Sequence, residues 1–183
     1  MDRRQRKTRE AIFNAFTDLL SIKSVNKITV GEIIEKADVG RATFYAHFET
    51  KDYLLEELCK ELFCHVFDST EGVSKTHRHI FECDICDSPF YHLMMHIKNN
   101  DNRILDLFSC DNNEMFLRYF KNGVLILVNS QYEMFESKYN NLPQEFAVNH
   151  IASSFVETVR WWIENGLKQS PEEINRYFFN TIS

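Results

Sequence analysis

Apolar residues recur at intervals of three and four along most of the chain, which is the spacing of one helical face. Near the N-terminus, Ile12, Phe16, Leu19 and Leu20 follow this spacing and predict a helix that begins near Thr8. The same pattern predicts later helices over residues 74–86, 88–99, 101–110, 112–138, 144–167 and 171–181. Asn-rich and Gly-containing stretches between them are typical of loops.

Three short helices are predicted within the first fifty residues. Thr29 stands three residues ahead of a glutamate, which is the capping-box spacing that starts a second helix. A tight turn follows, in which Gly40 can take a backbone conformation that is costly for other residues. A third helix over residues 41–48 turns Phe44 and Phe48 inward, because they are four apart. Two helices joined by a tight turn are a helix-turn-helix unit.

Composition supports an all-helical chain. Only 5 Gly and 3 Pro occur in 183 residues, too few turn formers for a protein of many short strands. We therefore predict an all-α fold of about nine helices, with a three-helix head and a C-terminal helical bundle. The predicted division is the head over residues 1–52 and the bundle over residues 53–183.

The net charge of -6 is unevenly distributed. Residues 1–51 carry ten Lys and Arg against seven Asp and Glu, whereas residues 52–183 carry eleven against twenty. A basic head on an acidic body is the electrostatic footprint expected of a protein that contacts nucleic acid at one end. We find no membrane segment or signal peptide, and five cysteines are too few for a disulfide scaffold. A cytoplasmic location is expected.

The sequence around the third helix resembles the tetracycline-repressor (TetR) family. The motif is Thr-Phe-Tyr-Ala-His-Phe over residues 43–48 followed by Lys51 at a helix start, within a match that covers roughly residues 8–58. The resemblance implies an all-helical homodimer that binds a palindromic operator, responds to an effector in its C-terminal domain and usually represses transcription. It assigns DNA binding to the domain of residues 1–52, and dimerisation and effector binding to the domain of residues 53–183. Residues 152–174 are similar to a Gram-positive subgroup that includes dihydroxyacetone-operon regulators.

Candidate DNA contacts lie on and beside the third helix. The guanidinium of Arg41 can bind guanine or a phosphate. The hydroxyls of Thr43 and Tyr45 and the imidazole of His47 can donate to phosphate oxygens. The resemblance implies base contacts for Arg41 and Ala42, and phosphate contacts for Thr29 and for the other residues listed below. Gly31 stands where some relatives place a base-reading Arg. The candidates are Thr29, Arg41, Ala42, Thr43, Tyr45, His47 and Lys51. The alternative is that Thr29 only caps its helix and that Tyr45 and His47 only cover the core edge.

Large apolar residues beyond residue 52 could serve two purposes besides filling a core. Some could line an effector pocket: Phe63, Phe67, Phe81, Met94, Phe108, Phe116, Phe120 and Trp161. Others could form the dimer interface: Phe155, Val159, Trp162, Tyr177 and Phe178. For both sets the alternative is the core of the monomer. The expected partners are double-stranded DNA, a second copy of the chain, and a small-molecule or protein effector.

Histidines and cysteines crowd into residues 77–96. They are His77, His79, Cys83, Cys86, His92 and His96. His79, Cys83 and Cys86 could share a helical face as soft metal ligands, which makes a metal- or thiol-responsive regulator the alternative function. An ordinary amphipathic helix is the competing interpretation. No cofactor is expected, and catalysis is not expected because phosphate loops, nucleophile elbows and paired-acid motifs are absent from the sequence.

Overall fold

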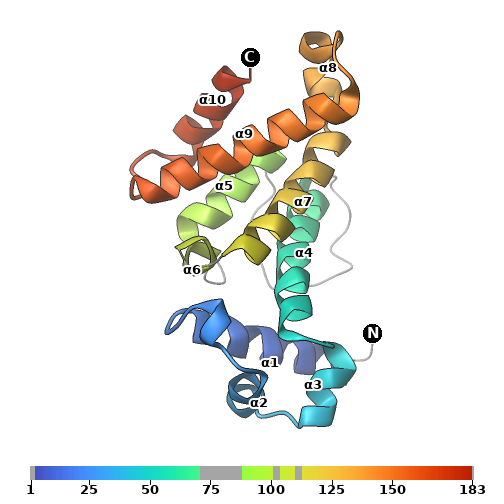
Figure 1. The fold of residues 1–183 in the computed structure, drawn as a ribbon, viewed down its shortest axis with the longest axis vertical. Coiled ribbons are helices and arrows are strands. Elements are labelled where there is room, and N and C mark those ends of the chain that lie inside the picture. The colour runs from blue at the N-terminus through green and yellow to red at the C-terminus, as the bar shows by residue number, and fades with distance from the viewer. Residues whose placement is uncertain (1–2, 71–87, 101–103, 110–112, 183) are drawn as a thin grey trace.

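The computed structural model describes residues 3–70, 88–100, 104–109 and 113–182, and the regular structure of these ranges is entirely helical (Figure 1). The elements are α1 (Arg3–Leu20), the 3₁₀ turn η1 (Val25–Lys27), α2 (Val30–Ala37), α3 (Arg41–His47), α4 (Lys51–Thr70), α5 (Pro89–Asn99), α6 (Ile104–Ser109), α7 (Glu114–Ser130), α8 (Glu133–Tyr139), α9 (Gln144–Glu164) and α10 (Pro171–Thr181). The predicted all-α fold is confirmed, with ten α-helices in the described ranges instead of about nine. In this part of the chain, none of the helices has the length and apolar character needed to cross a membrane.

Two predicted boundaries were wrong, and one predicted helix cannot be compared. Helix α1 begins at Arg3 rather than near Thr8, because the polar N-terminal residues continue the helix without an apolar face. The single helix expected over residues 112–138 is two helices, α7 and α8. Between them the Gln131 N–H bonds to two carbonyls at once, those of Leu127 and Val128, and the chain turns. The helix expected over residues 74–86 lies outside the described residues.

The head consists of α1, α2 and α3, at the lower end of the molecule in Figure 1. Its core contains Phe13, Phe16, Phe44 and Phe48, each at most 1% exposed. The rings of Phe13 and Phe48 meet edge to face with centroids 5.3 Å apart, an arrangement that aromatic pairs favour. The core therefore fixes α3 against α1.

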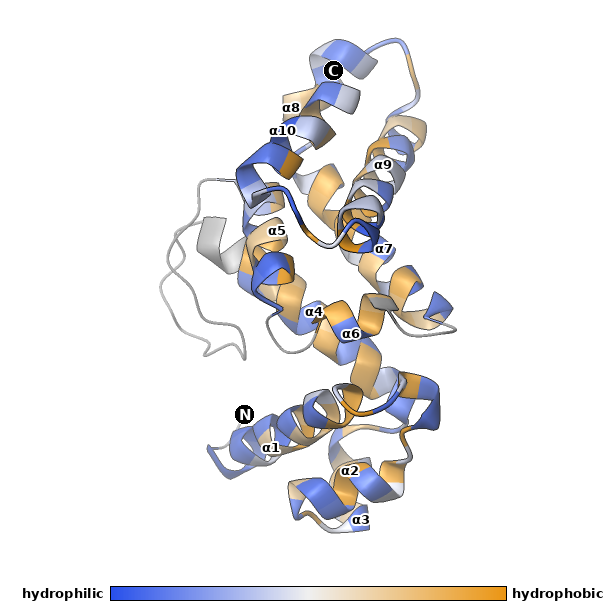
Figure 2. Cartoon of the chain, turned by 90° about the vertical axis from the view of Figure 1, so that its left-hand side faces the viewer, coloured by the Kyte–Doolittle hydropathy of each residue, from blue (hydrophilic) through white to orange (hydrophobic). Residues whose placement is uncertain are grey.

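Helix α4 runs from the head into the body, where it packs against α5 and α7 (Figure 1). Helix α7 also packs against α9, and α10 covers α5 and α9. Figure 2 shows hydrophobic residues concentrated on α4 and α7. Phe90 of α5 lies at the centre of a second aromatic group, with ring centroids 5.5 Å from Phe155 and 5.3 Å from Phe178. The body is thus a layered helical bundle with an aromatic core.

Four residues proposed for the dimer interface lie in this core instead. Phe155, Val159, Trp162 and Phe178 are all 0% exposed, covered by their own chain. The Trp162 indole N–H donates to the Gln169 carbonyl at 3.2 Å, which satisfies its polar atom. These side chains hold α9 and α10 to the bundle. For these four residues the alternative, the core of the monomer, is therefore what the structure shows. Of the five, Tyr177 alone is on the surface, 39% exposed.

Candidate DNA-binding surface and histidine cluster

Helix α2 begins with a complete capping box, as predicted. The Glu32 N–H donates to Thr29 Oγ1 at 3.3 Å, and the Thr29 N–H donates to Glu32 Oε2 at 2.9 Å. A hydrogen bond from the Lys23 ammonium, together with those from Thr29, lowers the pKa of Glu32 to about 2. A carboxylate at this point also interacts favourably with the helix dipole. Thr29 is therefore fixed in place and exposed at the start of the helix.

The turn between α2 and α3 uses a residue other than the glycine that we predicted. Asp38 has φ of 52° and is left-handed, and its N–H reaches the carbonyls of Ile34 and Glu35. Gly40 has φ of -72° and is the N-cap of α3. The assignment of the unusual conformation to Gly40 was wrong, because aspartate is one of the few other residues that tolerate it. The helix-turn-helix geometry is nevertheless formed.

Helix α3 has one buried and one exposed side. Phe44 and Phe48 are 0% exposed, as their spacing predicted. Facing outward are Arg41, Ala42, Thr43 and Tyr45, with His47 half-buried. The ring of Tyr45 meets that of Phe44 edge to face at 5.5 Å, yet the side chain remains 46% exposed. The guanidinium and hydroxyl groups of α3 are thus presented to the outside on a short helix that is anchored from behind.

Lys51 has a structural role that the sequence did not reveal. Its Nζ donates to the Val25 carbonyl at 2.8 Å and to the Ile28 carbonyl at 3.0 Å, in and just after the 3₁₀ turn. An ammonium has three N–H donors, so one is left for an external oxygen. The side chain joins the start of α4 to the loop between α1 and α2.

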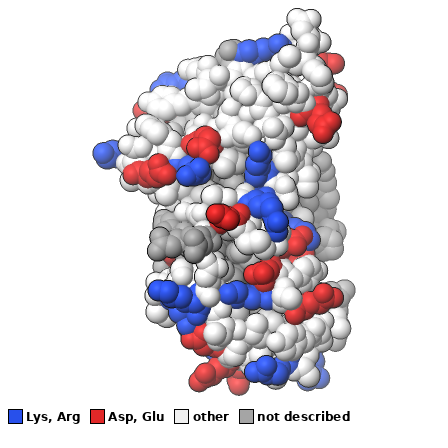
Figure 3. Space-filling model, in the orientation of Figure 1, with Lys and Arg blue, Asp and Glu red and all other residues white. Residues whose placement is uncertain are grey.

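Charge on the head is mixed. Lys/Arg and Asp/Glu side chains are interspersed over the lower part of the face shown in Figure 3. The first turns of α1 add exposed basic residues that were absent from the predicted contacts, namely Arg3, Arg4, Arg6 and Lys7. The run of Lys and Arg at the N-terminus was the sequence signal that could have identified these residues. They give the head a group of cations in addition to Arg41 of α3 and Lys51 of α4.

The aromatic residues proposed for an effector pocket form a packed cluster. Phe108 lies 4.8 Å from Phe116 and 4.9 Å from Phe120 between ring centroids, and Phe63 lies 5.5 Å from Phe120. Met94 is also 0% exposed. The structure therefore brings together α4, α6 and α7 through these rings. The Phe67 side chain and Phe81 lie outside the described part of the chain.

Trp161 does not belong with this cluster. It is 45% exposed on α9, whereas its neighbour Trp162 is fully buried. Adjacent helical residues point about 100° apart, so the two indoles cannot share one environment. Trp161 therefore lies apart from the buried aromatic residues proposed for the same pocket.

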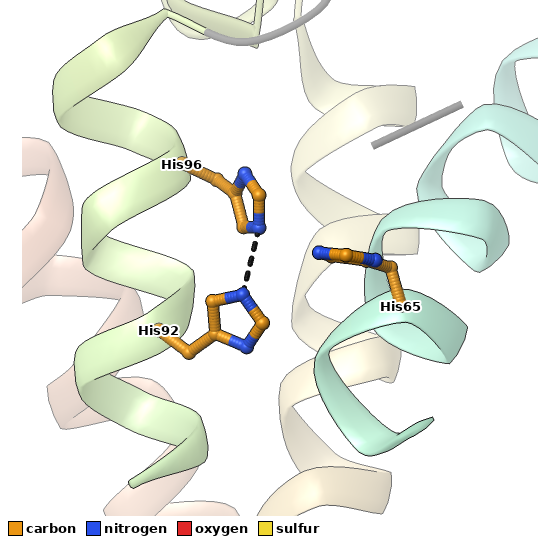
Figure 4. A group of neighbouring side chains, drawn as sticks. All are labelled: His65, His92 and His96. Atoms are coloured by element: carbon orange, nitrogen blue, oxygen red, sulfur yellow. Dashed lines mark hydrogen bonds between the residues drawn. The ribbon is translucent and has the colours of Figure 1, made fainter. Parts of the chain in front are cut away.

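A buried group of three histidines joins α4 to α5 (Figure 4). His65, His92 and His96 are 6%, 0% and 1% exposed, and their ligand nitrogens all lie within 4.8 Å of one another. The Nε2 atoms of His92 and His96 are 2.9 Å apart and share a hydrogen bond. Burial, and secondly His96, lowers the pKa of His92 to about 4, so this imidazole is neutral at pH 7.

The composition of this group differs from the cluster predicted at residues 77–96. His92 and His96 were in that cluster, but His65 was not, because it stands 27 residues before His92 on another helix. His77, His79, Cys83 and Cys86 lie outside the described residues. The spacing of four between His92 and His96 was the available signal, and only the packing of α4 against α5 supplies the third imidazole.

Comparisons with known proteins agree with the fold and the head. Residues 12–58 match the family model described as bacterial regulatory proteins, tetR family. Residues 86–183, more than half of the chain, match the model described as transcriptional regulator C-terminal region. Two uncharacterized HTH-type transcriptional regulators of Bacillus subtilis are similar: YxbF is 39% identical over 71 residues and YvdT 30% over 63 residues. These matches cover 36% and 34% of this chain but only 19% and 32% of those two proteins.

Solved structures give wider coverage. A TetR transcriptional regulator from Streptococcus agalactiae is 32% identical, with a TM-score of 0.73 over 100% of this chain and 97% of that one. The regulator FadR of Bacillus subtilis, solved with stearoyl-CoA, is 18% identical and has the same fold, with a TM-score of 0.62 over 94% of this chain and 96% of that one. The helix-turn-helix head, the helical body and these matches together show that the chain belongs to the TetR family of transcriptional regulators.

Proposed function

We propose that this protein is a sequence-specific repressor that binds a palindromic operator as a homodimer and is controlled by an effector at its C-terminal domain. In this proposal residues 1–52 bind DNA and residues 53–183 dimerise and receive the effector. The observation that carries it is the exposed row on α3, which is supported from behind by the buried Phe44 and Phe48. The narrower likeness to dihydroxyacetone-operon regulators stays a prediction.

Each candidate contact has a chemical role in this proposal. Arg41 and Ala42, in the first turn of α3, read base edges in the major groove, where a guanidinium can bind guanine through two hydrogen bonds. Thr43, Tyr45 and His47 bind phosphates, and the Tyr45 ring also reaches a thymine methyl. Thr29 and Lys51 add phosphate contacts at the starts of α2 and α4. Phosphate contacts position the head, whereas base contacts specify the sequence.

Two heads are needed because one short helix reads only a few base pairs. In a dimer the two α3 helices would occupy half-sites separated by one helical turn of DNA, about 34 Å, or a multiple of it. The candidate interface is the outer side of α9 and α10, which exposes Phe146 by 61%, Trp161 by 45% and Tyr177 by 39%. Phe146 and Trp161 are fifteen residues apart, which places them about 60° from each other around the helix. In this proposal Phe146 and Trp161 take the place of the four interface candidates that are buried in the monomer.

The effector is proposed to act through the body. Aromatic and apolar side chains from α4, α6 and α7 favour an apolar small molecule, and the FadR neighbour of the same fold was solved with stearoyl-CoA. A protein effector is the alternative that follows from the subgroup resemblance. An effector changes operator binding only through its different affinity for the binding and non-binding arrangements of the two heads.

Footprinting on the DNA that flanks the coding sequence tests the DNA-binding role. We expect a protected palindrome whose half-sites have the spacing given above. Arg41→Ala should weaken binding and relax the preference for the operator, and Tyr45→Ala should weaken binding to all sequences about equally. Lys168→Ala, an exposed cation of the body, is the control and should bind as wild type. Absence of a protected palindrome, or undiminished binding by both α3 variants, rejects the assignment.

A further inference from the structure

Three imidazoles face one another in the interior of the body, between α4 and α5 (Figure 4). The ring centroids of His65 are 5.0 Å from those of His92 and 4.8 Å from those of His96, and the His92 and His96 rings are 4.7 Å apart. All three side chains are buried. Polar rings in such a place are costly unless they are hydrogen-bonded or bind an ion. Three buried imidazoles whose nitrogens converge in this way are the arrangement that ligands of one ion have.

The spacing of the nitrogens suits a small transition-metal ion. A tetrahedral ion with bonds of about 2.05 Å places its nitrogen ligands about 3.3 Å apart. The Nε2 atoms of His92 and His96 are 2.9 Å apart, and the ligand nitrogens of the whole group lie within 4.8 Å, so small rotations of the rings would reach that geometry. His92 and His96 stand one turn apart on the same face of α5, as in other helical pairs of histidine ligands.

We propose that His65, His92 and His96 form a binding site for a divalent first-row transition ion, with Zn²⁺ as the best match. Imidazole nitrogen is a ligand that zinc prefers, whereas Mg²⁺ and Ca²⁺ prefer oxygen. Three protein ligands leave a fourth position for water or a small anion. The hydrogen bond between His92 and His96 would give way to two bonds to the ion, and the imidazole that donates it would carry its proton on Nδ1 instead.

Binding would clamp α4 to α5 at a defined distance from the head. His65 stands fourteen residues after Lys51 on the same helix, about 21 Å along its axis. The near end of α4 is held to the head by Lys51 and by the Arg9–Glu57 ion pair. An ion that fixes α4 against α5 would therefore fix the orientation of the head. This consequence rests on the proposed function, because it makes the ion an effector of operator binding.

The site is tested first without DNA, on the full chain freed of metal. Titration with Zn²⁺ should give one equivalent bound with a Kd below about 1 μM, and Co²⁺ should give the intense visible absorption of a tetrahedral site. Mg²⁺ should not bind. His92→Asn and His96→Asn should each weaken zinc binding at least about 100-fold. His150→Asn, which replaces an exposed histidine on α9, is the matched control and should bind zinc as wild type.

X-ray absorption of the zinc-loaded wild type identifies the ligand atoms of the ion. It does not depend on whether the histidine variants fold. We expect three imidazole ligands and no sulfur. Sulfur ligation, loss of binding in a Cys83→Ser, Cys86→Ser double variant, or unchanged binding in both folded histidine variants would each overturn the site. So would failure of the wild type to bind zinc.

A second measurement separates the regulatory consequence from the proposed function. Operator affinity is compared with and without one equivalent of Zn²⁺, in wild type and in His96→Asn. We expect a change of at least about tenfold in the wild type and none in the variant. Equal affinity in the wild type with and without zinc would overturn the regulatory role. If neither form binds any operator, the DNA-binding proposal fails, while the metal site is still decided by the titration.

Discussion

Arg9 of the head and Glu57 of α4 form an ion pair, in which Nη2 donates to Oε2 over 2.6 Å. The same guanidinium lies 5.0 Å from the ring centroid of Phe13 and 4.9 Å from that of Phe48. Burial alone would raise the pKa of Glu57, but hydrogen bonds from Arg9 and Lys60 outweigh it and lower the pKa. One arginine thus connects the aromatic core of the head to the helix that leads into the body.

Glu57→Gln is expected to lower the free energy of unfolding by about 1–3 kcal/mol, because a half-buried, charge-assisted hydrogen bond is lost. Urea unfolding checks this. The matched control is Glu164→Gln, whose partner Arg160 lies on the surface at 3.9 Å, and it should change stability by less than about 0.5 kcal/mol. Equal effects of the two substitutions would contradict a linking role for Arg9 and Glu57.

Gly123→Ala should destabilise the body by about 1–3 kcal/mol although alanine is the better helix former. A Cβ at this position would lie 2.2 Å from two ring atoms of Phe63, which is buried in the aromatic cluster. Gly31→Ala on α2 is the control, since the nearest atom to its added Cβ is 3.8 Å away, and it should be neutral or stabilising. Thermal melts of both variants decide the matter.

A smaller residue at Phe63 gives a further check on this contact. In the double variant Phe63→Leu, Gly123→Ala, the two costs should not add, because leucine leaves room for the new methyl group. Additive losses of stability would show that the cost at position 123 has another origin.

Lys51→Ala and Tyr45→Ala should both weaken DNA binding, but only the first should lower the stability of the protein. The Lys51 ammonium holds two backbone carbonyls of the head, whereas Tyr45 projects outward with 46% of its surface exposed. We expect a loss of about 1–2 kcal/mol for Lys51→Ala and less than about 0.5 kcal/mol for Tyr45→Ala. Urea unfolding in the absence of DNA measures both. A wild-type unfolding curve for Lys51→Ala would contradict the structural role.

The hydrogen bond from Lys23 to Glu32, together with the capping box at the start of α2, should make stability depend on acid pH. The folded pKa of Glu32 is about 2 and its ordinary value is 4.5, so the folded state favours the carboxylate. Its contribution is complete above pH 4.5 and is lost as the pH falls from 4.5 to about 2. Wild type should therefore be more stable than Glu32→Gln at pH 7, and the two should converge near pH 2. A difference that is constant over this range would refute the assignment.

The sequence by itself determined the features that depend on neighbours along the chain. The capping box at Thr29 forms as its spacing indicates, because both partners lie within one helical turn. Phe44 and Phe48 are buried for a similar reason, since residues four apart share a helical face. The family resemblance of residues 8–58 rests on the same local pattern.

Only the tertiary structure decided which apolar and polar residues meet across helices. Apolar spacing predicted that Trp162 and Phe178 are buried. It could not distinguish the core of the monomer from a dimer interface, because both bury an apolar helix face. Likewise, His92 and His96 were visible as a pair, while the third imidazole comes from α4. Local spacing determines which side of a helix is apolar. The packing of helices distant in sequence determines what that side contacts, and thereby whether three histidines become one site.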